Sequence, residues 1–138
     1  MDVEGRTALA KGAICGIIAL MNSGDGPTNG FSYYLGVNDN VPHGLAGAVF
    51  LKEVMSYNIS HGYSEYQELL PINSDELLAI FSEIYDYFSI KKLSSFGYNT
   101  NNIDKFVDGA TESLKGSFDG NPILFNRGSA KEVVSNLI

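Results

Sequence analysis

His43 and His61 are the only two histidines of the chain. An imidazole can coordinate a divalent metal, exchange a proton near neutral pH, or make an ordinary hydrogen bond. The two lie 18 residues apart, too far to share a helix face within one or two turns. His43 stands in the sequence VPHG, where a proline ends an extended segment and an apolar helix is expected to begin. It is therefore either a metal ligand or a local capping residue, and one histidine alone does not make a metal centre.

The motifs of common enzyme classes are absent from the sequence. It contains no GxGxxG or GxxxxGK[ST] phosphate loop, no GxSxG nucleophile elbow and no HExxH zinc motif. Cys15 is the single cysteine, which excludes an internal disulfide, and we interpret it as a small buried hydrophobic residue. Asp25, Asp39 and Asp119 lie in loops rich in Gly and Asn, where we expect them to form turns.

Length and composition indicate one globular domain. The chain has 138 residues, of which 44% are hydrophobic and 18% are charged. The net charge of −7 argues against nucleic acids and anionic membranes as partners, because both bind clustered Lys and Arg. The apolar stretch AKGAICGIIALM is shorter than the about 20 residues that span a bilayer. With one cysteine and no positively charged leader, we expect a cytoplasmic protein.

Hydrophobic residues recur at helical spacing along nearly the whole chain, and no alternating run indicates a strand. The stretch Leu9–Met21 is apolar on most sides and contains Gly12 and Gly16, so we predict a central helix with a second helix packed closely on it. The Gly- and Pro-containing sequence SGDGPTNG (23–30) is expected to break the chain, and FSYYLG (31–36) follows as a short apolar segment.

Four more helices are predicted downstream. The first begins near His43, and Asn73 with Glu76 forms a capping box before another helix. A third covers residues 103–114, and Ser129 with Glu132 is predicted to cap the last one. The stripe predicted to face the core from the second of these helices consists of Leu77, Phe81, Ile84 and Phe88. The predicted fold is all-α, with residues 1–138 forming one helical domain.

Several blocks of sequence carry a resemblance in chain order. PHGLAGAVFLKEVMSYN (42–58) resembles the PHG-x-A-x-A-x-x-L-P-x-V-x-x-[FY]-N stretch of the iron-containing alcohol dehydrogenases. DVEGRTALAKGAICGIIALMNSG (2–24) is similar to a family helix with an acidic start and a glycine-rich end. FSYYLG falls on a segment that closes in Leu-Gly, and GNPILFNRGSAKEVVSNLI (120–138) resembles the C-terminal ending of the family.

The resemblance implies an NAD(P)-dependent oxidoreductase with two domains. In this family an N-terminal α/β domain binds the nicotinamide cofactor, and a C-terminal helical domain holds Fe²⁺ or Zn²⁺ through one Asp and three His. The metal polarises the substrate oxygen while hydride passes to or from the nicotinamide. On this plan the chain is the later part of the helical domain. The NAD(P)-binding domain and the helix with the first two ligands would lie outside it.

Two ligand positions of the family fall on this chain. His43 occupies the second, and the first, 14 residues earlier, falls on Asn29. Asn is a weak donor for Fe²⁺ or Zn²⁺ compared with imidazole. Three interpretations are open: a metal held by fewer protein donors and more water, catalysis without a tightly bound metal, or an inactive site.

Tyr33 falls on a family histidine near the substrate, four residues after the first ligand position. Its phenol could hydrogen-bond the reacting oxygen or relay a proton, and it is the candidate catalytic residue. The alternative is that Tyr33 packs on the domain with its hydroxyl at the surface. His61 matches no family ligand, and we expect it to be exposed.

The resemblance predicts the C-terminal fragment of an alcohol dehydrogenase-like oxidoreductase that acts on a small alcohol, aldehyde or ketone. Alone it should bind neither NAD(P) nor the metal and should be inactive. One alternative is a fragment of a dehydroquinate synthase-like cyclase, although Leu45 follows His-Gly where that group has an acidic residue. Another is a stand-alone, non-catalytic helical interaction module. In every case we expect the apolar face of Leu9–Met21 to be uncovered and to favour self-association.

Overall fold

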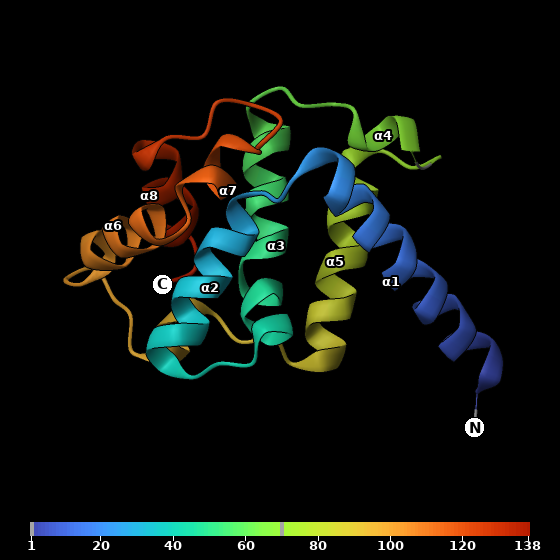
Figure 1. Ribbon diagram of the computed structural model, residues 1–138, viewed down its shortest axis with the longest axis horizontal. Helices are drawn as coiled ribbons and strands as arrows, with labels where there is room; N and C mark the ends of the chain where they lie inside the picture. The colour runs from blue at the N-terminus through green and yellow to red at the C-terminus, as the bar shows by residue number, and fades with distance from the viewer. Residues whose placement is uncertain (1, 70) are drawn as a thin grey trace.

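The computed structural model describes residues 2–69 and 71–138, and these form helices without any strand (Figure 1). The all-α prediction is confirmed. In the described part of the chain the elements are α1 (Val3–Ser23), α2 (Pro27–Asp39), α3 (His43–Ser60), α4 (Tyr66–Leu69), α5 (Ser74–Phe88), the short 3₁₀ helix η1 (Leu93–Phe96), α6 (Ile103–Ser113), α7 (Lys115–Asp119) and α8 (Arg127–Ser135).

Helix α3 lies in the middle of the molecule, between α2 and α5 (Figure 1). Of its predicted apolar positions, Ala46, Val49, Phe50 and Val54 are buried, whereas Met55 is only half-buried. Asn40 reverses the chain between α2 and α3 in the left-handed conformation, with φ of 55°. Such a short connection makes α2 and α3 neighbours, so residues at the end of one helix meet the start of the next.

Helix α2 is longer than the sequence predicted. Residues 27–30 were assigned to a chain break, but Pro27 is the first residue of the helix. Proline suits this position because its missing N–H would have no partner in the first turn of a helix. The break is therefore confined to residues 24–26, and Phe31 and Leu35 of α2 are completely buried.

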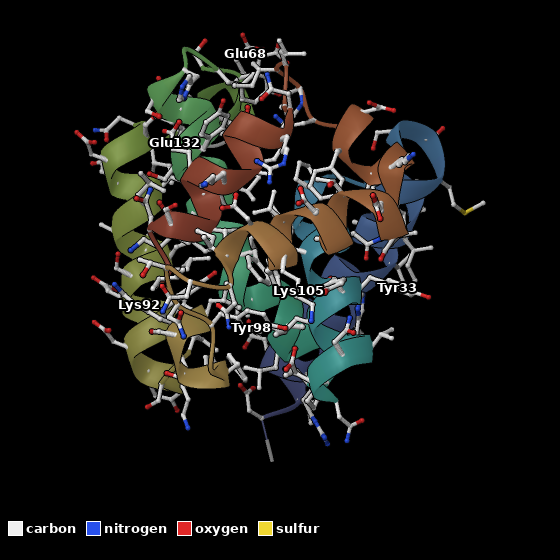
Figure 2. The ribbon with its side chains drawn as sticks, turned by 90° about the vertical axis from the view of Figure 1, so that its left-hand side faces the viewer. Tyr33, Glu68, Lys92, Tyr98, Lys105 and Glu132 are labelled. Atoms are coloured by element: carbon white, nitrogen blue, oxygen red, sulfur yellow. The ribbon has the colours of Figure 1, made fainter. Side chains whose placement is uncertain are left out.

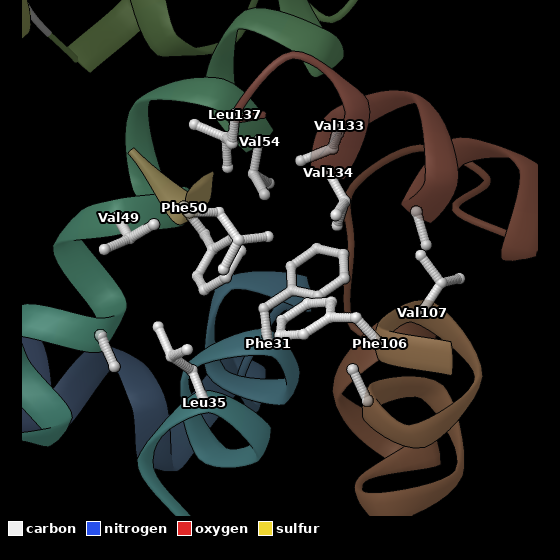
Figure 3. Close-up of a cluster of buried hydrophobic side chains, with 14 of the residues drawn as sticks. Phe31, Leu35, Val49, Phe50, Val54, Phe106, Val107, Val133, Val134 and Leu137 are labelled. Carbon is white, nitrogen blue, oxygen red and sulfur yellow. The ribbon is translucent and has the colours of Figure 1, made fainter. Parts of the chain in front are cut away.

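The core is a cluster of aromatic and aliphatic side chains from α2, α3, α6 and α8 (Figure 3). Phe31 lies at its centre, with ring centroids 5.0 Å from Phe50 and 5.2 Å from Phe118. The helix predicted over residues 103–114 supplies Ile103, Phe106, Val107 and Ala110 to this core as expected, whereas the predicted Leu114 follows the end of α6 and is half-buried. Burial of this apolar surface is the main source of stability of the fold.

Two predictions about the later helices need correction. The capping box of Asn73 and Glu76 at α5 is confirmed, but the stripe that begins at Leu77 leaves the core: Ile84 is 43% exposed and Phe88 is 66% exposed. Helix α5 packs mainly on α3, and the side that faces α3 is only half-buried, as at Phe81 and Tyr85. Helix α8 begins at Arg127, because Asn126 rather than Ser129 is its N-cap. Asn caps a helix as well as Ser does, and Ser129 reaches back from the third helical position.

The prediction of a central first helix is wrong. Helix α1 leads away from the other helices and has no buried residue (Figure 1). No atom lies within 4 Å of a Cβ built on Gly12 or Gly16, so no described helix packs there, and Cys15 is exposed rather than buried. An apolar pattern shows that a helix needs a partner and does not show where that partner lies.

No single helix in residues 2–69 and 71–138 is both long enough and apolar enough to cross a membrane. Helices α1 and α2 are long enough and apolar enough only when they are taken together, and their axes are bent by 108° relative to each other.

We propose that copies of the chain associate through α1. Leu9 and Met21 are 76% and 81% exposed, and water contact with so large an apolar surface is unfavourable. Sedimentation velocity over about a hundredfold range of concentration should show a mass that rises with concentration. Ile17→Glu should remove this rise, whereas Leu124→Glu, which adds the same charge at an exposed loop leucine, should keep it. A monomer at every concentration would contradict the proposal.

Candidate functional site

Tyr33 and His43 line one shallow depression where α2 meets the start of α3. Its volume is ≈ 240 Å³. The lining residues are Ser32, Tyr33, Gly36, Val37, Val41 and His43. His43 is the first residue of α3, as the sequence predicted, and it is exposed. Tyr33 is 46% exposed and its side chain points out from the surface (Figure 2). A phenol and an imidazole therefore face solvent from the same hollow.

Asn29 takes part in a different cluster. Its side-chain amide donates a hydrogen bond to the carboxylate of Asp25, and Ser117 Oγ donates to the same carboxylate at 2.8 Å. Partial burial raises the pKa of Asp25, but the hydrogen bonds from Ser117, Asn29 and its own backbone outweigh burial and bring the pKa below its ordinary value. Asp25 is thus ionised at neutral pH, and the cluster ties the start of α2 to α7.

The contact between α2 and α7 depends on two glycines. A Cβ on Gly30 would lie 2.4 Å from the ring of Phe118, and one on Gly120 would lie 2.0 Å from the carbonyl oxygen of Asp25. Neither position has room for a side chain, so the two segments approach closely. This close approach brings Ser117 to Asp25.

The sequence did not predict this cluster. Asp25 was expected to form a turn, yet it accepts hydrogen bonds from two other side chains. Asp25 lies four residues before Asn29 but outside α2, in a segment that was expected to break the chain, so the sequence carried no helical signal for this pair. Ser117 lies 92 residues from Asp25, and only the fold reveals that contact.

His61 lies at the other end of α3 from His43 and is exposed, as predicted. Its ring stacks on Tyr57 at a centroid distance of 4.0 Å, and its Nδ1 lies 2.9 Å from the carbonyl oxygen of Tyr57. His61 therefore ends the helix and does not join the depression at its start.

Comparison with known proteins was made with both sequence and structure. The sequence profile of the Fe-containing alcohol dehydrogenase family, C-terminal, matches residues 1–137. The chain belongs to this family. Its resemblance to the iron-containing alcohol dehydrogenases, based on the PHG block and the blocks around it, is thereby confirmed. No curated protein sequence shows a significant match.

Among solved structures, the chain is similar to one described as a crystal structure analysis of 1,3-propanediol oxidoreductase. The two share 20% sequence identity with a TM-score of 0.69. The match covers 83% of this chain and 33% of that oxidoreductase. At this identity the similarity establishes the helical fold. The match thus spans about a third of the length of that oxidoreductase.

The name of the family implies iron, and the described residues do not fit such a metal. Among them no group of three His, Cys, Asp or Glu could hold a metal ion. His43 supplies one imidazole, whereas the amide of Asn29 bonds to Asp25 and Asn29 is not among the residues that line the depression. Protein metal centres need about three protein donors. The described part of the chain therefore has one donor of a site of this kind.

We expect divalent metals to leave the stability of this chain unchanged. Stoichiometric Zn²⁺ or Fe²⁺ should move the midpoint of thermal unfolding by less than about 1 °C, because a single imidazole binds metals too weakly to stabilise the folded state. EDTA should have as little effect. The measurement is a melting curve followed by circular dichroism, with His43→Ala as the control variant. A rise of several degrees that His43→Ala abolishes would show that the chain does hold a metal.

Proposed function

We propose that this chain is the substrate-facing helical part of an NAD(P)-dependent alcohol dehydrogenase-like oxidoreductase. The observation that carries the proposal is the match of the family profile over residues 1–137. The chain spans 33% of the length of the propanediol oxidoreductase that it resembles in fold. We therefore propose that it does not transfer hydride alone and that the nicotinamide is held by a further domain.

Tyr33 and His43 are the proposed contacts to the substrate oxygen. The phenol O–H of Tyr33 can donate to a carbonyl oxygen or accept from an alcohol, and the exposed imidazole of His43 can do either through one of its nitrogens. Two such groups beside one hollow would orient a small alcohol, aldehyde or ketone. The nicotinamide, when bound by the further domain, would supply or accept the hydride, while these side chains would hold the proton at the substrate oxygen.

The mass of the natural protein is the first test. An antibody raised against this chain should detect a band of about 40 kDa in the cells that produce the natural protein, the size of two typical domains. The 138-residue chain itself should not oxidise NADH or NADPH in the presence of small aldehydes. A band near the 14.9 kDa of this chain would contradict the proposal and favour an interaction module. Turnover by the chain alone would contradict it as well.

Tyr33→Phe tests the role of the phenol in the full-length form. It should lower kcat/KM by about tenfold, the value of one lost hydrogen bond in the transition state. Tyr87→Phe removes a hydroxyl from a tyrosine that is 83% exposed on α5, and it should leave kcat/KM unchanged. If both variants retain full activity, Tyr33 only packs on the surface of α2.

A further inference from the structure

A second hollow lies on another face of the molecule, between α3, α5 and the C-terminal residues. Its volume is ≈ 320 Å³. The lining residues are Val49, Lys52, Glu53, Ser82, Tyr85, Asp86, Ile90, Lys91, Lys92, Asn136 and Leu137. Lys92 lies on the opposite side of the view from Tyr33, so this hollow is separate from the α2–α3 depression (Figure 2). We call it the lysine cavity.

Three of the nine basic residues of this acidic chain line the lysine cavity: half-buried Lys52 and the exposed Lys91 and Lys92. The ammonium of half-buried Lys52 donates to Ser82 Oγ at 2.7 Å, and that hydroxyl donates onward to the carbonyl of Leu78 at 2.9 Å. Within residues 2–69 and 71–138, none of the three lysines forms an ion pair. Lys52 is thus held by a neutral hydroxyl, which does not neutralise its positive charge as a carboxylate would.

Two carboxylates also line the lysine cavity. Glu53 accepts a hydrogen bond from Asn136 Nδ2 at 2.7 Å, which engages one of its oxygens, and Asp86 is exposed at the rim. The lining thus holds three lysines and two acids, although the whole chain carries a net charge of −7. The cavity is therefore less acidic than the chain as a whole.

The wall of the lysine cavity is fixed by an unusual contact. In a regular α-helix the backbone N–H of Lys52 would donate to the carbonyl of Ala48. The hydroxyl of Tyr85 lies between these two groups: it accepts from the N–H of Lys52 at 3.1 Å and donates to the carbonyl of Ala48. Burial raises the pKa of Tyr85 above its ordinary value, so the phenol keeps its proton at neutral pH. This bridge holds α5 against α3 and fixes the base of Lys52 before any ligand arrives.

We propose that the lysine cavity binds a small phosphate ester, with its phosphate group among Lys52, Lys91 and Lys92. Lysine binds phosphate as a mobile point charge, and three ammonium groups suit a dianion better than a single carboxylate. Half-buried Ile90 offers apolar surface to the carbon part of the ester, while Glu53 and Asp86 can accept from its hydroxyls. The volume lies at the lower end of ligand pockets, which begin at about 300 Å³.

Titration of the intact chain with inorganic phosphate, glycerol 3-phosphate and acetate at constant ionic strength tests this proposal. Amide shifts of Ser82, Lys91 and Lys92 in NMR spectra should saturate with phosphate and, at lower concentration, with glycerol 3-phosphate. Acetate should bind at least about tenfold more weakly, because it carries half the charge. Shifts that do not saturate, or equal affinity for acetate, would overturn the proposal.

Three matched variants locate the site. Lys52→Gln should weaken glycerol 3-phosphate binding by about tenfold, as expected for one lost charge-assisted hydrogen bond. Lys92→Gln, at an exposed position that tolerates substitution, should weaken it as well. Lys105→Gln on α6 lies outside the lysine cavity and should leave it unchanged (Figure 2). Equal weakening by Lys105→Gln would show that binding is only a general effect of surface charge, and no weakening by Lys92→Gln would show that the phosphate does not lie among the three lysines.

Discussion

Replacing Phe31 by Ala is expected to lower the free energy of unfolding by about 3–5 kcal/mol. Phe31 is 0% exposed, and its ring lies within 6.3 Å of the ring centroids of Phe50, Phe106, Phe118 and Phe125. Removal of the ring leaves a cavity that neighbours on four different segments cannot fill together. Urea denaturation followed by circular dichroism measures the loss.

Phe88→Ala is the matched control for this substitution. Phe88 is 66% exposed at the end of α5, so its removal should change the free energy of unfolding by about 0.5 kcal/mol or less. The pair also tests the corrected view of α5, since the sequence pattern had placed Phe88 in the core. A similar loss from both substitutions would mean that the end of α5 is buried in solution.

The fold could be predicted wherever a helix buries one well-defined stripe. Helices α3 and α6 are of this kind, because apolar residues at spacings of three and four all face the same core. Helix α2 was harder, since its first turn consists of Pro, Thr, Asn and Gly, which are typical of turns. Its helical state depends on Phe31 and Leu35 packing against α3, which is information from outside the segment.

Helices α1 and α5 show where the pattern is insufficient. Both carry apolar residues at helical spacing, yet α1 has no buried residue and α5 has only Leu77 buried. Periodicity records which side of a helix prefers to avoid water and contains no information on what covers it. The same limit explains Cys15, whose apolar neighbours in sequence are as exposed as it is.

Around the candidate site, the sequence predicted where residues lie along a helix better than which residues contact one another. The VPHG motif placed His43 at a helix start, and the structure shows it there beside Tyr33. The hydrogen bond from Ser117 to Asp25 was not predicted, because it joins segments that meet only after the core has formed. Contacts between residues so far apart in the sequence are determined by how the helices pack, here by the close approach at Gly30 and Gly120.

A pair of side-chain amides, buried Asn58 and half-buried Asn121, holds the far end of α3 to the loop between α7 and α8. Asn58 is 1% exposed, and its Nδ2 donates to Asn121 Oδ1 at 3.0 Å while Asn121 Nδ2 donates back to Asn58 Oδ1 at 2.8 Å. The Nδ2 of Asn58 also donates to the hydroxyl of Tyr66 at 3.0 Å. Each polar atom of Asn58 thus has a partner, so the pair is stable without water.

Asn58→Asp should lower the free energy of unfolding by about 2–4 kcal/mol near neutral pH. The side chain keeps its shape, but it loses both donors, places an oxygen against Asn121 Oδ1 and buries a charge. Burial raises the pKa of the introduced carboxylate in the folded state, so folding takes up a proton and the loss becomes smaller as pH falls. Urea denaturation at about pH 7 and about pH 4.5 measures both effects.

The exposed residue Asn101 provides the control for this charge. Asn101→Asp should change the free energy of unfolding by about 0.5 kcal/mol or less at either pH, because its carboxylate stays in water. Partial recovery at low pH in Asn58→Asp alone identifies burial of charge as the cause. A loss that does not depend on pH would instead indicate that the broken amide pair accounts for the whole effect, and would contradict the predicted rise in pKa.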